Sequence, residues 1–234
     1  MTALQGRKQA MPRAPRVTVG GLVYHVLNRA NGRMRLFEAQ GDYFAFEKVL
    51  QEAHDHVAMR TIAYCVMPNH WHLVLWPRND GDISEFMQWL TLTHTQRWHA
   101  AHETTGTGHL YQGRFKSFPI EQDKHYLTVC RYVERNALRA GLVSLAEDWR
   151  WGSLWRRTHG DAETKTLLSE GPRSWPKGWL AMVNRAQMEA DESTIRTCIL
   201  RERPFGNSPW VEETCRRLGL ASTLRPRGRP PLVI

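Results

Sequence analysis

The chain has 234 residues and a formal net charge of +9 at pH 7, so it is strongly basic and long enough to bury a core. Most of the basic residues are arginines, whose planar guanidinium suits phosphate, so a polyanionic partner is indicated, although many basic proteins bind no nucleic acid. The sequence has no closely spaced cysteine pair, no signal peptide and no long apolar run, so we expect reduced thiols, a cytoplasmic location and no membrane partner.

Residues 1–16 form a basic, proline-containing arm, which either contacts phosphates or is a solvated terminus. From residue 17 to residue 157 the patterns predict one succession of strands and helices. These are a strand at 17–27, a helix at 42–57, strands at 59–66 and 70–76, a helix at 82–99, a bend and strand within 111–120, and a helix at 123–140 that ends at Gly141. This order predicts an α+β fold, with an antiparallel sheet and helices mainly on one face.

The remainder of the chain is interpreted as an appendage to that domain. Its parts are a polar linker at 158–189 and a helical, DNA-binding-like extension at 190–234, with helices predicted at 190–201 and 209–218. The two helices are compatible with a helix-turn-helix, although helical hairpins are common. Arg227 and Arg229 stand in an Arg-Gly-Arg-Pro run that resembles an AT-hook, whose arginines enter a minor groove; a solvated basic tail is the alternative.

Two histidines follow a tight Pro-Asn turn in the stretch PNHWHLVLW, at the start of the third predicted strand. Side chains two residues apart in a strand point to the same face, so His70 and His72 should stand side by side. Two imidazoles on a rigid strand form half of a divalent-metal site. Such a pair on its own is more often structural, because histidine has many hydrogen-bonding uses.

The helix predicted at 123–140 carries polar side chains that the fold alone does not require. Asn136 falls at the edge of the apolar stripe, where a buried amide needs partners. Tyr132 lies one turn earlier; considered alone, it is better explained by packing. Arg131, Arg135 and Arg139 follow one another at intervals of four residues, and aligned arginines repel one another unless an anion such as a phosphate backbone lies along them.

The stretch YQGRFKSFPI interleaves basic and aromatic side chains on the fourth predicted strand. This pattern suits single-stranded nucleic acid, because Arg114 and Lys116 can pair with phosphates while aromatic rings stack on bases. The alternative places the aromatic rings in the core and leaves the two basic side chains solvated.

A common site would result if the helix packs across the strand that carries the histidines. The two imidazoles and the Asn136 carbonyl oxygen would then hold Mg²⁺ or Mn²⁺, with open positions for a phosphodiester. The Tyr132 oxygen would attack phosphorus, forming a phosphotyrosine and freeing a 3′-hydroxyl. Neighbouring cations favour the phenolate form that this attack needs.

The motifs PNHWHLVLWP, GHLYQGRFKSF and YVERNALRAGLV, in this order and spacing over residues 17–157, resemble the REP-associated tyrosine transposases, IS200-like members of the HUH single-tyrosine nucleases. The resemblance implies a sheet with a ferredoxin-like core. It also implies a metal-dependent endonuclease and strand transferase that acts on single-stranded DNA at hairpin-forming extragenic palindromes in a bacterial cytoplasm. By the same resemblance His70 and His72 are the metal pair, Asn136 is the third ligand and Tyr132 is the nucleophile.

Two other functions remain compatible with the sequence. A catalytically inactive DNA-binding regulator would use the basic arm and tail without metal. An RNA-binding module would share the sheet, but the aromatic pattern typical of such modules is missing. The sequence leaves open whether the protein is a monomer or a dimer.

Overall fold

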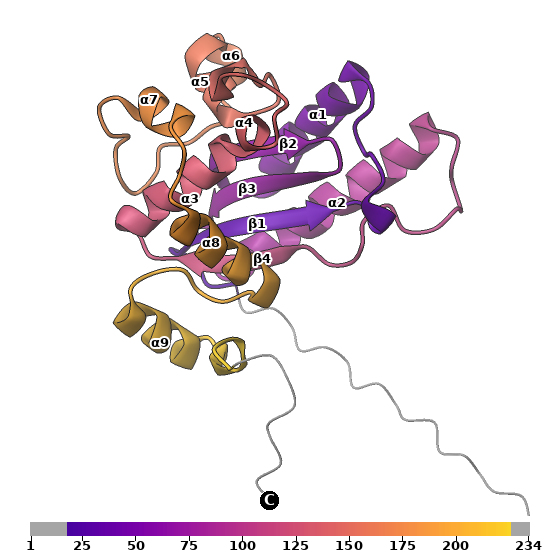
Figure 1. Cartoon of the computed structure of the whole chain (residues 1–234). Coiled ribbons are helices and arrows are strands. Elements are labelled where there is room, and N and C mark those ends of the chain that lie inside the picture. The colour runs from indigo at the N-terminus through magenta and orange to yellow at the C-terminus, as the bar shows by residue number, and fades with distance from the viewer. Residues whose placement is uncertain (1–17, 226–234) are drawn as a thin grey trace, which may run out of the picture.

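The computed structural model describes residues 18–225, and a four-stranded sheet lies at its centre (Figure 1). The arm at 1–16 and the tail residues Arg227 and Arg229 lie outside the described residues. The strands are β1 (Val23–Arg29), β2 (Arg60–Met67), β3 (His70–Trp76) and β4 (Lys116–Ile120), in the order β2-β3-β1-β4. All neighbouring strands are antiparallel, as predicted.

One face of the sheet is covered by the two helices that connect its strands. These are α1 (Gln40–His56), which joins β1 to β2, and α2 (Asp82–Ala101), which joins β3 to β4. Alternate side chains of the strands, such as Val26 and Leu73, enter the same core as Phe46 of α1 and Phe86 of α2. This strand-helix-strand-strand-helix-strand order is the ferredoxin-like arrangement that was expected.

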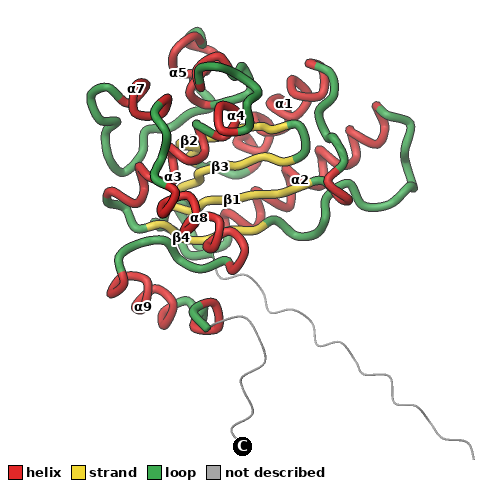
Figure 2. Tube along the Cα trace, viewed as in Figure 1, coloured by secondary structure: helices red, strands yellow, loops and turns green. Residues whose placement is uncertain are grey.

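Further helices cover the opposite face, so the expectation of helices mainly on one face is corrected (Figure 2). They include α3 (Lys124–Glu134), α7 (Trp179–Asn184) and α8 (Glu189–Arg201). Val74 and Phe118 of the sheet pack there with Val129 and Ile195. Helices pack on both faces because the strands are apolar on both. β2, for example, is buried on both faces along most of its length, so each face needs a layer of helices to exclude water.

The helix predicted at 123–140 consists of two pieces. It stops at Glu134 and resumes as α4 (Asn136–Arg139), with Arg135 between them at φ −82° and ψ −2°. The end at Gly141 is confirmed, because this glycine adopts a left-handed φ of 68°.

The remaining elements of the described chain are short. They are α5 (Ser153–His159), α6 (Ala162–Lys165), α9 (Ser208–Arg217) and 3₁₀ turns at Asn31–Arg33, Ala146–Asp148 and Ala221–Thr223.

The segment after residue 157 is folded against the domain. Residues 158–189, predicted as a linker, contain α6 and α7, and Trp179 and Val183 are buried in the second core. These residues are mostly polar, so the few apolar side chains that anchor the segment were not recognised from the sequence. The division into domains stays a prediction.

The predicted helices at 190–201 and 209–218 correspond to α8 and α9. This extension is tied to the edge of the sheet. The Phe205 amide donates to the Pro119 carbonyl at 2.9 Å, and the Glu121 amide donates to the Phe205 carbonyl at 2.9 Å. The tie holds α8 over the second face of the sheet (Figure 1). Over residues 18–225, no helix has the length and apolar character needed to cross a membrane.

Candidate nuclease site

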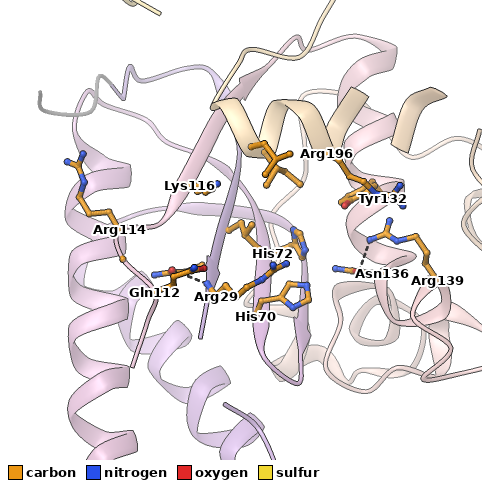
Figure 3. Close-up of a pocket in the computed structure, with 15 residues that line it drawn as sticks. Arg29, His70, His72, Gln112, Arg114, Lys116, Tyr132, Asn136, Arg139 and Arg196 are labelled. Carbon is orange, nitrogen blue, oxygen red and sulfur yellow. Dashed lines mark hydrogen bonds between the residues drawn. The ribbon is translucent and has the colours of Figure 1, made fainter. Parts of the chain in front are cut away.

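A cavity of about 670 Å³ opens on the second face of the sheet, between the strands, the α3–α4 junction and α8 (Figure 3). It brings together most of the residues predicted from the sequence. Its lining residues are Leu27, Asn28, Arg29, His70, His72, Gln112, Gly113, Arg114, Lys116, Tyr132, Asn136, Arg139, Arg196, Ile199 and Leu200. Among the described lining residues five are basic and none is acidic, so the cavity favours anions.

The two histidines stand side by side on β3, with ring centroids 5.0 Å apart. In each ring a neighbour occupies Nδ1: His70 Nδ1 donates to Asn69 Oδ1 at 2.6 Å, and His72 Nδ1 lies 2.8 Å from His25 Nε2. In the tautomers in which both Nδ1 atoms donate, each Nε2 keeps a free lone pair. An imidazole held in this way is oriented to bind a metal ion through Nε2.

Burial keeps these imidazoles neutral at pH 7. It lowers the pKa of His70 to about 4, with further lowering by the charges of Arg29 and Arg139. Burial lowers the pKa of His72 well below its usual value, and that of His25 to about 3. The neutral form is the one that can coordinate a cation.

Tyr132 lines the same cavity and is only 4% exposed. Its ring meets His72 edge to face at a centroid distance of 5.9 Å, and the Arg139 guanidinium carbon lies 4.1 Å from its ring centre. The phenol is therefore held between an imidazole and a guanidinium, at one site with the histidine pair (Figure 3).

Asn136 is also buried in the cavity wall, as its place on the helix predicted. Its Oδ1 accepts a 2.7 Å hydrogen bond from Arg139 Nη2, while its Nδ2 has no partner among the described residues. The two amide ends are distinguished only by such hydrogen bonds. An amide oxygen has two lone pairs, so Oδ1 keeps one that a cation could use, next to the positive charge of Arg139.

Comparison with known proteins identifies the family of this chain. The profile of the family described as "Transposase IS200 like" matches residues 18–136. The chain belongs to the IS200-like transposase family. A Haemophilus influenzae protein named for the REP-associated tyrosine transposases is 24% identical over 119 residues, which cover 47% of this chain and 68% of that protein. A solved REP-associated tyrosine transposase bound to a REP hairpin shares the fold, with a TM-score of 0.51, 20% identity and coverage of 63% of this chain and 84% of that one.

Two of the three aligned arginines do not reach the cavity of this IS200-like transposase. Arg131 Nη2 donates to the Arg185 carbonyl at 2.9 Å, and Arg135 Nε donates to the same carbonyl at 2.8 Å. Only Arg139 turns into the cavity, because steps of four residues drift about 40° around a helix and α3 breaks at Arg135. A DNA-binding role for the first two stays a prediction.

Several residues of the transposase site were missed from the sequence. His25 and Asn69 orient the two histidines, and Arg29 lines the cavity beside them. His25 gave a usable signal, since it is a histidine within an otherwise apolar strand. Arg196, with Ile199 and Leu200, comes from α8, which no local pattern connects with β3.

The buried carboxylate of Glu134 holds the helix that carries Tyr132 in place. Glu134 accepts hydrogen bonds from Ser153 Oγ at 2.6 Å and from Trp179 Nε1 at 2.7 Å, and forms an ion pair with Arg157. These contacts join α3 to α5 and α7, and therefore set the position of the phenol.

A second group of possible metal ligands lies outside this cavity. Glu121, Asp123 and His125 offer ligand atoms that lie within 4.8 Å of one another. Structural bonds already occupy all three: the Glu121 carboxylate accepts from the backbone and side chain of Asn207, Asp123 caps α3, and His125 Nδ1 lies 2.7 Å from Asp123 Oδ1. This group is explained by the anchoring of α9 and α3.

Proposed function

We propose that this chain is a metal-dependent single-stranded DNA endonuclease and strand transferase that acts on hairpin-forming palindromic DNA through a 5′-phosphotyrosine intermediate. One observation carries the proposal: a tyrosine, a pair of neutral histidines and a buried amide line one basic cavity. Membership of a transposase family agrees with that chemistry. We further propose that the protein acts in the bacterial cytoplasm, on nucleoid DNA.

The side chains fit a divalent cation of the Mg²⁺ or Mn²⁺ class. His70 Nε2, His72 Nε2 and Asn136 Oδ1 would hold it, since an amide oxygen has two lone pairs and Arg139 uses one of them. The bound ion would supply Lewis-acid polarisation of the scissile phosphate. Two nitrogen ligands accommodate Mn²⁺ more readily than Mg²⁺.

The chain's own groups then account for the transfer step. The Tyr132 oxygen forms a bond to phosphorus as the bond from phosphorus to the 3′ oxygen breaks. The phenol gives up one proton and the departing 3′ oxygen takes one up, so the products are a 5′-phosphotyrosine and a free 3′-hydroxyl. Arg139, stacked on the phenol ring, stabilises the negative charge that develops on the phenol oxygen. Attack by a 3′-hydroxyl on the phosphotyrosine would join the strands again.

The DNA strand would follow the basic side chains that line the cavity. Arg114 and Lys116 lie at the β4 side, and Arg196 lies on α8 opposite them. A single strand between these walls would pair its phosphates with the guanidinium and ammonium groups. A hairpin substrate is proposed because a relative with the same fold was solved with a REP hairpin.

The bond between Arg139 and Asn136 favours a second candidate, a catalytically inactive DNA-binding regulator, since it places a positive guanidinium against the oxygen that a cation would need. One experiment distinguishes the nuclease from the inactive regulator. An end-labelled hairpin oligonucleotide is incubated with Mg²⁺, Mn²⁺ or EDTA, and both cleavage and covalent attachment are measured.

We expect cleavage with protein attached to the 5′ phosphate, and no cleavage by Tyr132→Phe. Tyr126→Phe is the matched control, because Tyr126 is a tyrosine of the same helix that is buried in the core. Equal cleavage by Tyr132→Phe and the parent protein would reject the mechanism. Binding without cleavage under every metal condition would identify the regulator.

A further inference from the structure

Arg29 lies at the centre of the cavity and has no assigned role. It is the last residue of β1 and the direct antiparallel partner of His70. Figure 3 shows its side chain in the cavity beside the two histidines. Both sides of its backbone are fixed, since its amide donates to Asn28 Oδ1 at 2.9 Å and its carbonyl accepts from the Gln112 amide at 2.9 Å. The side chain is thus mounted on a rigid strand.

The charge of Arg29 is uncompensated within the described part of the chain. Its Nε is buried and has no hydrogen-bond partner, and none of the described ion pairs includes it. Two other arginines differ, because Arg156 pairs with Glu47 at 2.9 Å and Arg157 pairs with Glu134. Arg29 is half-buried, and a cation that is partly withdrawn from water without a counter-charge is stabilised when an anionic ligand supplies one.

The residues around Arg29 indicate that this anion is a phosphate of the substrate strand. No acidic residue is found among the described residues that line the cavity, so the counter-charge must come from outside. Arg139, whose guanidinium lies over the phenol ring, already donates to Asn136. Arg29 is free to present two N–H groups, the fork that matches two oxygens of one phosphate.

We propose that Arg29 is a catalytic residue that binds the non-bridging oxygens of the scissile phosphate and stabilises their charge while Tyr132 attacks. This inference rests on the proposed function. Arg29 forms no covalent bond and transfers no proton; it offers preorganised donors where negative charge increases. It approaches the phosphate from the β1 side, whereas Arg139 lies over the phenol.

The test exchanges the scissile phosphodiester for a neutral methylphosphonate in the hairpin oligonucleotide. We expect Arg29→Ala and Arg29→Met to slow cleavage of the normal strand by about 10²–10³-fold, the usual loss for one preorganised donor. On the neutral linkage the same variants should lose little relative to the parent. Arg35→Ala is the control, because Arg35 is an exposed arginine outside the cavity, and it should cleave like the parent.

A binding measurement keeps the inference separate from the proposed function. In the Tyr132→Phe background, Arg29→Met should weaken binding of the charged strand roughly tenfold and leave binding of the methylphosphonate strand unchanged. Equal effects on the two strands, in cleavage or in binding, would overturn the role of Arg29. Failure of the parent protein to form any covalent adduct would instead reject the proposed function, while the binding comparison would still decide whether Arg29 meets that phosphate.

Discussion

The hydrogen bond between His25 and His72 gives a prediction that separates a metal site from a structural histidine cluster. His25 is buried on β1, and its ring stacks on Phe118 at a centroid distance of 4.9 Å. His25→Phe preserves an aromatic ring in that stack but removes the ring nitrogen that lies 2.8 Å from His72 Nδ1. His72 then loses the partner that fixes its tautomer and the direction of Nε2.

The expected loss in metal affinity is about 10–100-fold, the usual effect of removing such a partner, or about 1.4–2.7 kcal/mol.

The same substitution also changes how the stability of the fold depends on pH. Burial lowers the pKa of His25 to about 3, so the folded protein keeps this ring neutral while the unfolded chain protonates it below the ordinary value of about 6.5. The stability associated with the neutral ring is therefore present above pH 6.5 and is lost as the pH falls toward 3. At pH 5 the loss is about 2 kcal/mol, and the phenylalanine variant does not suffer it.

Mn²⁺ titration calorimetry at pH 7 and urea unfolding at pH 7 and pH 5 measure the two effects. His94→Phe is the matched control, because His94 is also buried with its pKa lowered to about 3, but it bonds to Tyr111 on the other face of the sheet. Both variants should reduce the loss of stability between pH 7 and pH 5. Only His25→Phe should weaken Mn²⁺ binding. Unchanged Mn²⁺ affinity in His25→Phe would refute the metal role of the histidine cluster.

Three further predictions follow from the same structure. Glu134→Gln leaves Arg157 without its carboxylate, so the free energy of unfolding in urea should fall by about 3–5 kcal/mol; a loss below about 1 kcal/mol would contradict the buried ion pair. Arg196→Ala should lower single-stranded DNA affinity and reduce the salt slope by about 0.7, whereas Arg216→Ala, in a similar local ion pair on α9, should change neither; equal effects would remove α8 from the DNA path. EDTA should abolish cleavage but leave DNA binding measurable in a gel-shift assay, and cleavage that persists in EDTA would exclude the cation.

The parts of the fold that were predicted from the sequence are those governed by local periodicity. The strands and α1, α2, α8 and α9 were located because apolar residues alternate in strands and recur every three or four residues in helices. The same regularity placed His70 beside His72 on β3, and Tyr132 one turn before Asn136 on the helix. These four residues line the cavity, so short-range geometry was sufficient for the centre of the site.

The parts that were missed depend on contacts between distant segments. Residues 158–189 resembled a linker because few of them are apolar, yet Trp179 reaches Glu134 across the second core. Arg131 and Arg135 bond to the backbone around Arg185, a contact that the helix pattern alone does not show, and their DNA-binding role stays a prediction. The cover of α8 over the cavity depends on the tie between Phe205 and β4, which no local pattern contains.

The most direct test of the shared site is to identify the residue that becomes linked to DNA. After reaction of the full chain with a single-stranded hairpin oligonucleotide and Mn²⁺, the adduct is digested and the DNA-bearing peptide is sequenced by mass spectrometry. We expect the linkage at Tyr132, through the 5′ phosphate. A linkage at Tyr126 or any other side chain, or cleavage that leaves no protein attached, would contradict the assignment of Tyr132 as the nucleophile beside the histidine pair.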